Sequence, residues 1–330
     1  MDIGESINAW LERCPDPGSV PLVGMAEAGL LAPASSYVDI ARGKAALVAR
    51  TGLPGIAGVW GGPQVTARWF IAGFGNAEQQ AVWLQRRISV AISEPGAGAH
   101  PKLLTTRADV IGDEFHISGE KAWVSNGPSA DAFIVLAIIG ERDDRKRYSA
   151  FVVPRETPGV TLNDMAGFHA LRPSRHCGLL LQDVAVPRTA MLGPEGAAYE
   201  AMALPFRDIE DAVGTFTLLG AFRFLRARLT GADNEAASSL GAITGLMAVF
   251  ADAAEAVVTA VDANRWSDKA ATLTGLHVMA ADLLQRLRAH VEPSDAVAQQ
   301  LLADLDVLLS VAKGPRHTRQ MRLGHGIGGR

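Results

Sequence analysis

The chain has 330 residues, of which 48% are hydrophobic and 20% charged, and its formal net charge is −4. This composition is typical of a globular protein with a large core, and the charge argues against a nucleic-acid partner because nucleic-acid binders are normally basic. Two cysteines are too few for a disulfide scaffold, so we expect a cytoplasmic protein. We find no metal-ligand motif, no signal-peptide pattern and no apolar run of about 18 residues, and therefore predict no metal site and no membrane span.

The first part of the chain, residues 1–88, is predicted to be helical. Ile7, Trp10 and Leu11 repeat at helical spacing before a Pro-Asp-Pro-Gly break at 15–18. Further helical patterns, separated by breaks rich in glycine and proline, cover 23–31, 37–51, 65–73 and 75–84.

The middle part, residues 89–195, changes to short runs of apolar and β-branched residues. Turn signals such as Gly-Asp at 112–113 and Thr-Pro-Gly at 157–159 separate these runs. Regular short strands of this kind predict a β-barrel or sandwich. The charged segment 141–147 is predicted to be the solvated tip of a hairpin.

The last part, residues 196–330, returns to helical periodicity over 199–229, 236–264, 267–291 and 294–313. Four helices with short links predict an antiparallel bundle. The predicted fold is therefore α+β and multi-domain, with an N-terminal helical domain (1–88), a central β-barrel (89–195) and a C-terminal four-helix bundle (196–330).

Two glycine-containing segments are the most informative feature of the chain. Residues 91–100 read AISEPGAGAH, where glycines allow close backbone approach and consecutive amides can form an anion nest. Residues 119–127 read GEKAWVSNG, and strand periodicity places Trp123 and Ser125 on one face. An aromatic wall beside a hydroxyl suits a flat ring with polar edges. Alone, the first segment fits an ordinary Pro-Gly turn between a helix and a barrel better than a cofactor site.

Together these segments resemble the acyl-CoA dehydrogenase family, which uses similar ones to hold FAD. The segments SAFVVP (149–154), GFHALRPS (167–174) and DVAVP (183–187) extend the similarity, and the helix–barrel–helix order matches the family's fold. The resemblance implies that Ile92 and Ser93 touch the flavin, Trp123 packs on it and Ser125 hydrogen-bonds its reactive edge. It also places Gly98 and Ala99 beside the pyrophosphate, although Ala99 and His100 replace the family's Ser-Asp and one phosphate contact is lost.

The same resemblance implies a desaturation of an acyl thioester. A base removes the α-proton while a hydride passes from the β-carbon to N5 of the flavin. The frame Asp208-Ile-Glu210 matches the position of the catalytic glutamate in some members, and the chain has none of the Tyr-Glu-Gly-Thr frame used by most others. Asp208 and Asp211 are expected to lie at the substrate, with Asp211 where the family commonly has arginine. Acidic residues near a helix N-terminus also stabilise the helix dipole without any chemistry.

The same resemblance also suggests the substrate and the partners of the chain. Arg172 and Ser174 keep the spacing of a loop near the flavin and substrate. We expect an acyl-CoA or acyl-carrier thioester as substrate and an electron-transferring flavoprotein as acceptor. The family's segments that reach a partner's FAD are missing, so a homo-oligomer and a heteromer with a longer member both remain open. The arginines of the tail, Arg316, Arg319 and Arg322, fit a solvated tail better than an anion contact.

Two other functions stay open at this point. The chain fits a non-catalytic or FAD-sharing subunit of a heteromeric acyl-CoA dehydrogenase, because Ser at 99 and Arg at 211 are lost. It also fits a related flavin monooxygenase or acyl-carrier dehydrogenase, because such proteins share the fold and the turn motifs.

Overall fold

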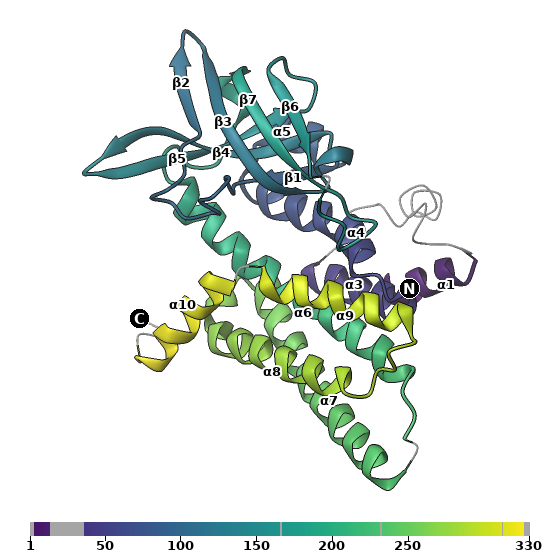
Figure 1. The fold of residues 1–330 in the computed structure, drawn as a ribbon. Coiled ribbons are helices and arrows are strands. Elements are labelled where there is room, and N and C mark those ends of the chain that lie inside the picture. The colour runs from purple at the N-terminus through teal and green to yellow at the C-terminus, as the bar shows by residue number, and fades with distance from the viewer. Residues whose placement is uncertain (1–2, 14–35, 166, 232, 312, 327–330) are drawn as a thin grey trace. The chain divides into compact units, whose positions relative to one another are not determined.

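The computed structural model describes residues 3–13, 36–165, 167–231, 233–311 and 313–326 (Figure 1). The chain separates into two compact units. We call the first the helical unit; it comprises Met1–Gly61, Ala170–Pro173 and Asp208–Arg330. The second, the sheet unit, comprises Gly62–His169 and Ser174–Arg207. The helix predicted at 23–31 lies outside the described residues, and the three-domain boundaries remain a prediction.

Most helices follow the predicted pattern closely from residue 36 onward. Those predicted over 37–51, 199–229, 236–264, 267–291 and 294–313 are all present within a few residues of their expected ends. The helices outside the sheet region are α1 (Ile3–Arg13), α3 (Tyr37–Thr51), α4 (Pro54–Thr66), α6 (Leu204–Ala227), α7 (Asn234–Asp262), α8 (Ala270–Arg288), α9 (Ala296–Ser310) and α10 (Lys313–Gly324). Two helices were not predicted. Helix α4 occupies the segment that we interpreted as a break rich in glycine and proline, and α10 lies in the tail that we expected to be solvated and unstructured.

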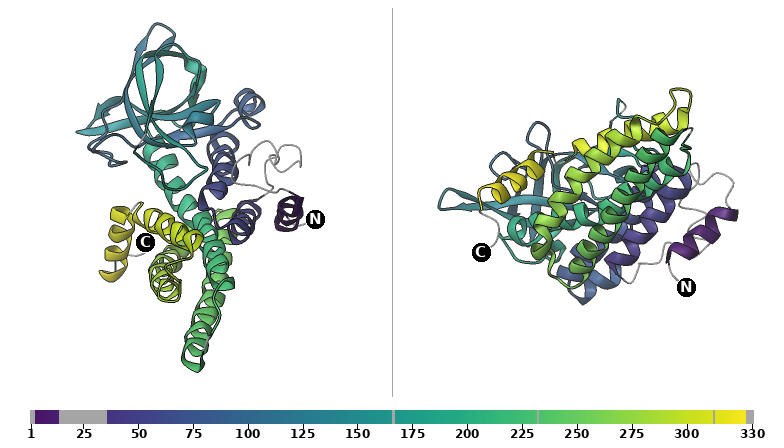
Figure 2. Two further views of the ribbon diagram at one scale, coloured as in Figure 1. Left: turned by 45° about the vertical axis from the view of Figure 1, so that its right-hand side comes forward. Right: turned by 90° about the horizontal axis from the view of Figure 1, so that it is seen from below.

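Within the helical unit, caps and apolar stripes explain where the helices begin and how they pack. Asp233 and Asp295 accept N-terminal amides of α7 and α9. At the far end of α7, the Asp262 carboxylate accepts the backbone amides of Tyr37 and Val38 at 2.8 and 2.9 Å, which ties α7 to the start of α3. Helix α8 contacts α7, α9 and α10, and Figure 2 shows the helices running alongside one another.

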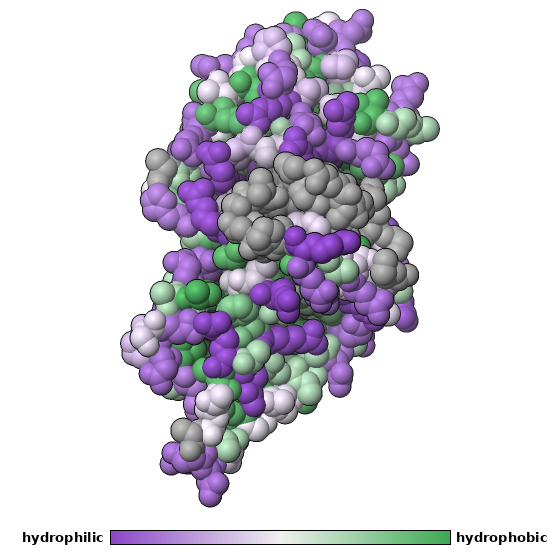
Figure 3. All heavy atoms as spheres, turned by 90° about the vertical axis from the view of Figure 1, so that its right-hand side faces the viewer, coloured by the Kyte–Doolittle hydropathy of each residue, from purple (hydrophilic) through white to green (hydrophobic). Residues whose placement is uncertain are grey.

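Helix α7 is the one helix in the described parts of the chain that is long and apolar enough to cross a membrane. That test rests on length and composition only, and core helices of water-soluble proteins also pass it. Its inward residues, among them Phe250, Val257 and Val261, are buried. The face of the molecule in Figure 3 mixes hydrophilic and hydrophobic side chains.

The sheet unit contains a single eight-stranded sheet, as the run of short apolar segments predicted. The strands lie in the order β6-β7-β3-β2-β4-β5-β8, and β1 pairs with β4 in parallel. They are β1 (Ile88–Ala91), β2 (Arg107–Ile111), β3 (Glu114–Ser125), β4 (Ala132–Arg142), β5 (Arg145–Pro154), β6 (Val160–Asp164), β7 (His176–Pro187) and β8 (Met191–Leu192). Helix α5 (Ala77–Trp83) precedes β1.

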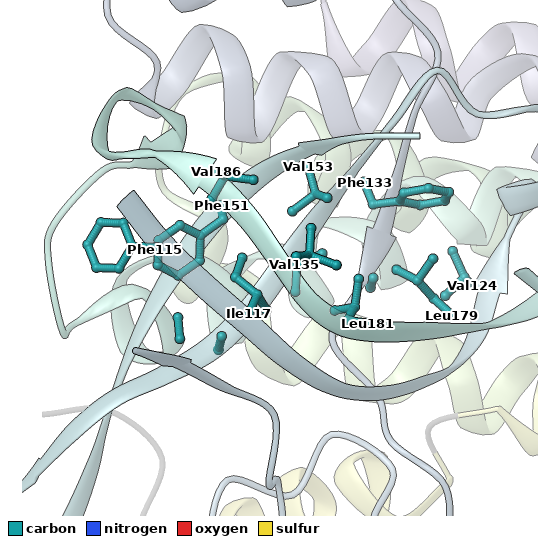
Figure 4. Packing of buried hydrophobic residues seen from close by; sticks show 14 of the residues in the cluster. Phe115, Ile117, Val124, Phe133, Val135, Phe151, Val153, Leu179, Leu181 and Val186 are labelled. Atoms are coloured by element: carbon teal, nitrogen blue, oxygen red, sulfur yellow. The ribbon is translucent and has the colours of Figure 1, made fainter. Parts of the chain in front are cut away.

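The sheet curls around one apolar core (Figure 4). Inward side chains of six strands (β1 to β5 and β7) form this core, including Ile117, Val135, Phe151 and Leu181. Burying side chains of this size contributes about 1.5–3 kcal/mol each, so the core fixes the register of the strands. The segment predicted to be a hairpin tip joins β4 to β5, with Asp143 and Asp144 exposed at φ of 50° and 56°.

Candidate functional site

The glycine turn begins directly after β1 and closes on itself. The amide of Glu94 donates to the Gly98 carbonyl at 2.9 Å, and the amides of Ala97 and Gly98 donate to the Glu94 carbonyl. Gly96 and Gly98 have φ of 69° and 55°, so the turn requires residues that tolerate left-handed backbone. The anion nest that we predicted is wrong for Ala97 and Gly98, because both amides are used within the turn.

A buried ion pair holds this turn against β3. Lys121 Nζ lies 2.9 Å from Glu94 Oε1, and the two side chains are 0% and 4% exposed. The other donors to the Glu94 carboxylate are the amides of Thr105 and Thr106 and the Thr105 hydroxyl, at 2.7 to 3.0 Å. Burial would raise the pKa of Glu94, but Lys121 and these hydrogen bonds lower it to about 2. The carboxylate is therefore permanently charged and has a structural role.

Trp123 stands out from β3 at a bulge. The pairing of β3 with β7 shifts between Lys121 and Val124, and Trp123 takes a φ of 60°, which is unusual for a bulky residue. The bulge frees the amide of Ala122, which donates to the Ser93 carbonyl at 2.8 Å. This bond brings the glycine turn and the tryptophan together, as the sequence predicted for residues of one site.

The indole of Trp123 is 52% exposed although its neighbour Val124 is fully buried. Its ring meets Phe168 edge-on, with ring centroids 5.4 Å apart. Ser125 is also exposed, so both side chains lie on the outward side of β3, as strand periodicity predicted. A large aromatic surface held outward in a strained backbone, beside hydroxyl groups, fits a flat ligand with polar edges such as an isoalloxazine.

The remaining residues predicted for this site lie in different surroundings. Ser174 is buried and donates to Asn126 Oδ1 at 2.9 Å. The Ala99 carbonyl accepts a hydrogen bond from the Tyr199 hydroxyl at 3.1 Å, and Ile92 is half-buried. Arg172 is exposed and belongs to the helical unit, where the amide of its neighbour Leu171 donates to Asp304 at 2.9 Å. The structure thus gathers Ser93, Trp123 and Ser125 within the sheet unit and assigns Arg172 to the other unit.

Glu210 lies on α6 in the helical unit. Solvent reaches its side chain, yet so much protein surrounds it that burial, the largest cause, raises its pKa to about 7. The Lys44 ammonium opposes this shift, and the Asp211 carboxylate adds to it. Among the described residues, no group donates a hydrogen bond to the Glu210 carboxylate. The surrounding protein atoms raise the pKa of Glu210. Because solvent reaches the side chain, the carboxylate can exchange protons with water.

Lys44 is a residue that sequence reasoning missed. It lies on α3, it is half-buried, and burial lowers its pKa to about 8 although Glu210 raises it. A Cβ on Gly61 would lie 2.9 Å from its side-chain stem, so glycine at that position leaves room for the lysine. No local pattern could have paired residue 44 with residue 210.

The two aspartates that flank Glu210 are bound within the chain. Arg316 of α10 makes a two-pronged contact with Asp211, with Nη2 at 2.6 Å and Nε at 3.2 Å from Oδ1. Arg319 binds Asp208 at 2.6 Å and Asp211 at 3.2 Å. The preference for a solvated tail is therefore wrong for Arg316 and Arg319, which are largely buried ion-pair partners, whereas Arg322 is exposed as expected. A substrate-binding role of Asp208 and Asp211 remains a prediction.

Comparisons with known proteins concern the middle part of the chain first. Residues 89–184 match the family model "Acyl-CoA dehydrogenase, middle domain". The human mitochondrial short-chain specific acyl-CoA dehydrogenase is 33% identical over 133 residues, which cover 38% of this chain and 32% of the relative. The match thus spans about a third of that relative's length.

Solved structures extend the similarity of fold to nearly the whole chain. A glutaryl-CoA dehydrogenase from Mycobacterium smegmatis superposes with a TM-score of 0.83 at 22% identity, covering 99% of this chain and 94% of that one. A second structure of a glutaryl-CoA dehydrogenase from the same organism, in complex with FADH2, gives a TM-score of 0.81 at 20% identity, covering 100% and 94%. At these identities the likeness concerns the fold, which is the predicted order of N-terminal helices, central sheet domain and C-terminal helices.

Proposed function

We propose that this chain, whose residues 89–184 match the acyl-CoA dehydrogenase middle domain, is a member of that family and an FAD-dependent enzyme that introduces an α,β double bond into an acyl thioester. The observation that carries the proposal is Glu210. Its carboxylate is reached by solvent, receives no hydrogen bond from the described residues and has a pKa raised to about 7. A base whose pKa lies near the working pH takes up a proton and releases it again efficiently.

The cofactor part of the proposal rests on the sheet unit. Trp123 supplies an exposed aromatic surface, and Ser125 is exposed on the same side of β3. The hydroxyl of Ser93 is assigned to the cofactor on the resemblance. FAD, when bound, supplies the two-electron acceptor for the hydride that leaves the β-carbon. The glutaryl-CoA dehydrogenase structure that contains FADH2 supports the choice of cofactor. Ile92, Gly98 and Ala99 are assigned to the cofactor, and Arg172, Ser174, Asp208 and Asp211 to the substrate, on the resemblance alone.

In this proposal Glu210 removes the α-proton of the thioester. The nearby Lys44 ammonium favours the charged carboxylate, and Asp211 opposes it. After the reaction the proton leaves to solvent, which reaches the side chain. The thioester is carried by CoA or a carrier protein, electrons pass to an electron-transferring flavoprotein, and the chain works as an oligomer in the cytoplasm. Cell fractionation and light scattering test the last two points.

The test is reduction of the flavin by substrate. Protein saturated with FAD is mixed anaerobically with a panel of saturated acyl-CoA thioesters, and the loss of visible flavin absorbance is followed. Glu210→Gln is expected to keep its FAD and to reduce the flavin about 10²–10⁴-fold more slowly, since one general base is lost. Glu292→Gln changes an exposed glutamate of the same unit and serves as the matched control.

The other outcomes have defined meanings. An unchanged rate in Glu210→Gln removes Glu210 as the base. Folded protein that holds no FAD points to the FAD-sharing or non-catalytic subunit, and a partner chain is then sought. Oxygen consumption by the reduced flavin with transfer of oxygen to the substrate points to the monooxygenase.

A further inference from the structure

Helix α10 is attached to α6 by a buried cluster of charges. The Arg316 fork grips the Asp211 carboxylate with Nη2 2.6 Å from Oδ1, and its Nη1 donates to the Leu309 carbonyl. The Asp211 side chain is 6% exposed, and His277 of α8 approaches it with Nε2 at 3.7 Å. Asp211 is thus enclosed by two arginines of α10 and by the imidazole of His277 of α8, whose pKa is lowered by burial. Burial would raise the pKa of Asp211, but Arg316, His277 and Arg319 hold that pKa below its ordinary value.

Arg319 extends this attachment by one turn of α6. Its Nη2 lies 2.6 Å from Asp208 and 3.2 Å from Asp211, and its side chain is 13% exposed. Asp208 and Asp211 are three residues apart, so they lie on the same face of α6. The two arginines therefore hold both ends of the turn that contains Glu210.

The Glu210 side chain takes no part in this contact between α6 and α10. Successive residues of an α-helix are rotated by about 100°, so Glu210 lies beside the face that carries Asp208 and Asp211. The arginines consequently bind the two neighbours, and no group in the described parts of the chain forms an ion pair with the glutamate. Among the described residues, the charged groups that act on Glu210 are Lys44 of α3 and Asp211 of α6. His277 of α8 and Arg316 and Arg319 of α10 lie against Asp211.

We propose that Arg316 and Arg319 are positioning residues for Glu210: by binding Asp208 and Asp211 they fix the turn of α6 that carries it and neutralise the carboxylate next to it. The inference rests on the proposed function in treating Glu210 as the base. Without the arginines, the uncompensated charge of Asp211 faces the Glu210 carboxylate and disfavours its charged form. Without Asp211, one carboxylate fewer opposes that form.

Direct titration of Glu210 tests the inference without any substrate. Protein labelled with carbon-13 in its glutamate carboxyl groups is titrated by NMR, and the Glu210 signal is identified by its absence in Glu210→Gln. Arg316→Gln is expected to raise the midpoint by about one pH unit, and Asp211→Asn to lower it by about the same amount. The double variant Arg316→Gln/Asp211→Asn is expected to titrate close to the wild type. Arg322→Gln, an exposed arginine of the same helix, is the matched control.

Opposite shifts that cancel in the double variant support the inference. Midpoints that stay at the wild-type value, or that move in the same direction in both single variants, overturn it. A contact that only stabilises the fold would change the thermal stability but would not shift the Glu210 midpoint up in one variant and down in the other. Circular dichroism establishes that each variant is folded. Where Arg316→Gln does not fold, Asp211→Asn decides alone, since asparagine keeps the shape and still accepts the arginine N–H groups.

Failure of the proposed function is recognised separately. An unchanged rate of flavin reduction in Glu210→Gln removes the base but leaves the NMR midpoints valid as a measure of what the arginines do. Conversely, a slow Glu210→Gln variant combined with unmoved midpoints keeps the base and removes the positioning role of Arg316 and Arg319.

Discussion

Glu94 of the sheet unit and Glu210 of the helical unit carry the same chemical group in opposite surroundings. Glu94 receives four hydrogen bonds, one of them from the ammonium of Lys121, and its pKa is lowered to about 2. Glu210 receives none from the described residues, and its pKa is raised to about 7. A full set of donors makes one carboxylate a permanent structural charge, whereas their absence leaves the other basic enough to take up a proton.

The largest effect is expected from breaking the Glu94–Lys121 pair. Glu94→Gln leaves the fully buried Lys121 without its counter-charge, and we expect it to lower the free energy of unfolding by about 3–5 kcal/mol. Denaturant unfolding followed by circular dichroism measures this. Glu114→Gln changes an exposed glutamate of β3, the strand that carries Lys121, and should stay within about 0.5 kcal/mol of the wild type. Equal stability of Glu94→Gln and the wild type would show that the pair has no structural role.

A smaller effect is expected from Lys44, which shares the region of Glu210. Lys44→Met keeps the apolar stem but removes the charge that lowers the pKa of Glu210. We expect the acidic limb of the pH–rate profile for flavin reduction to move up by about one unit, and the rate at neutral pH to fall about fivefold. Lys313→Met, which changes an exposed lysine of the same unit, is the control. A limb that does not move would mean that Lys44 does not act on Glu210.

The sequence predicted well where one continuous segment determines the structure. The glycine turn, the strand bearing Trp123 and Ser125, and most helices from residue 36 onward follow from turn chemistry and periodicity. Lys121 and Glu94 stood within the two motifs, but nothing in the pattern showed that they pair. The bulge at Trp123 was also hidden, because it depends on the register between β3 and β7.

Long-range pairings explain the predictions that were wrong. Two of the tail arginines look solvated in sequence because Asp208 and Asp211, which bind them, precede them by about a hundred residues. The anion nest looked plausible because a glycine-rich turn gives no sign of where its own amides donate; in the structure those of Ala97 and Gly98 turn inward to Glu94. Partner choice for polar groups is decided by tertiary packing, which local patterns do not encode.

The smallest effect is expected in the pH dependence of the free energy of unfolding, to which Glu94 and Glu210 contribute with opposite sign. The pKa of Glu210 is raised from 4.5 to about 7 in the folded chain. The stability that this shift contributes is fully present below pH 4.5 and is lost as pH rises through 7, because the folded state then holds a proton that the unfolded state has released. For Glu94, whose pKa is lowered from 4.5 to about 2, stability is instead lost as pH falls through that range. Denaturant unfolding from pH 4 to 8 should therefore show a shallower decline in Glu210→Gln than in the wild type. Identical curves would mean that Glu210 titrates near its ordinary value, and the carboxylate would then be too weak a base for the role proposed.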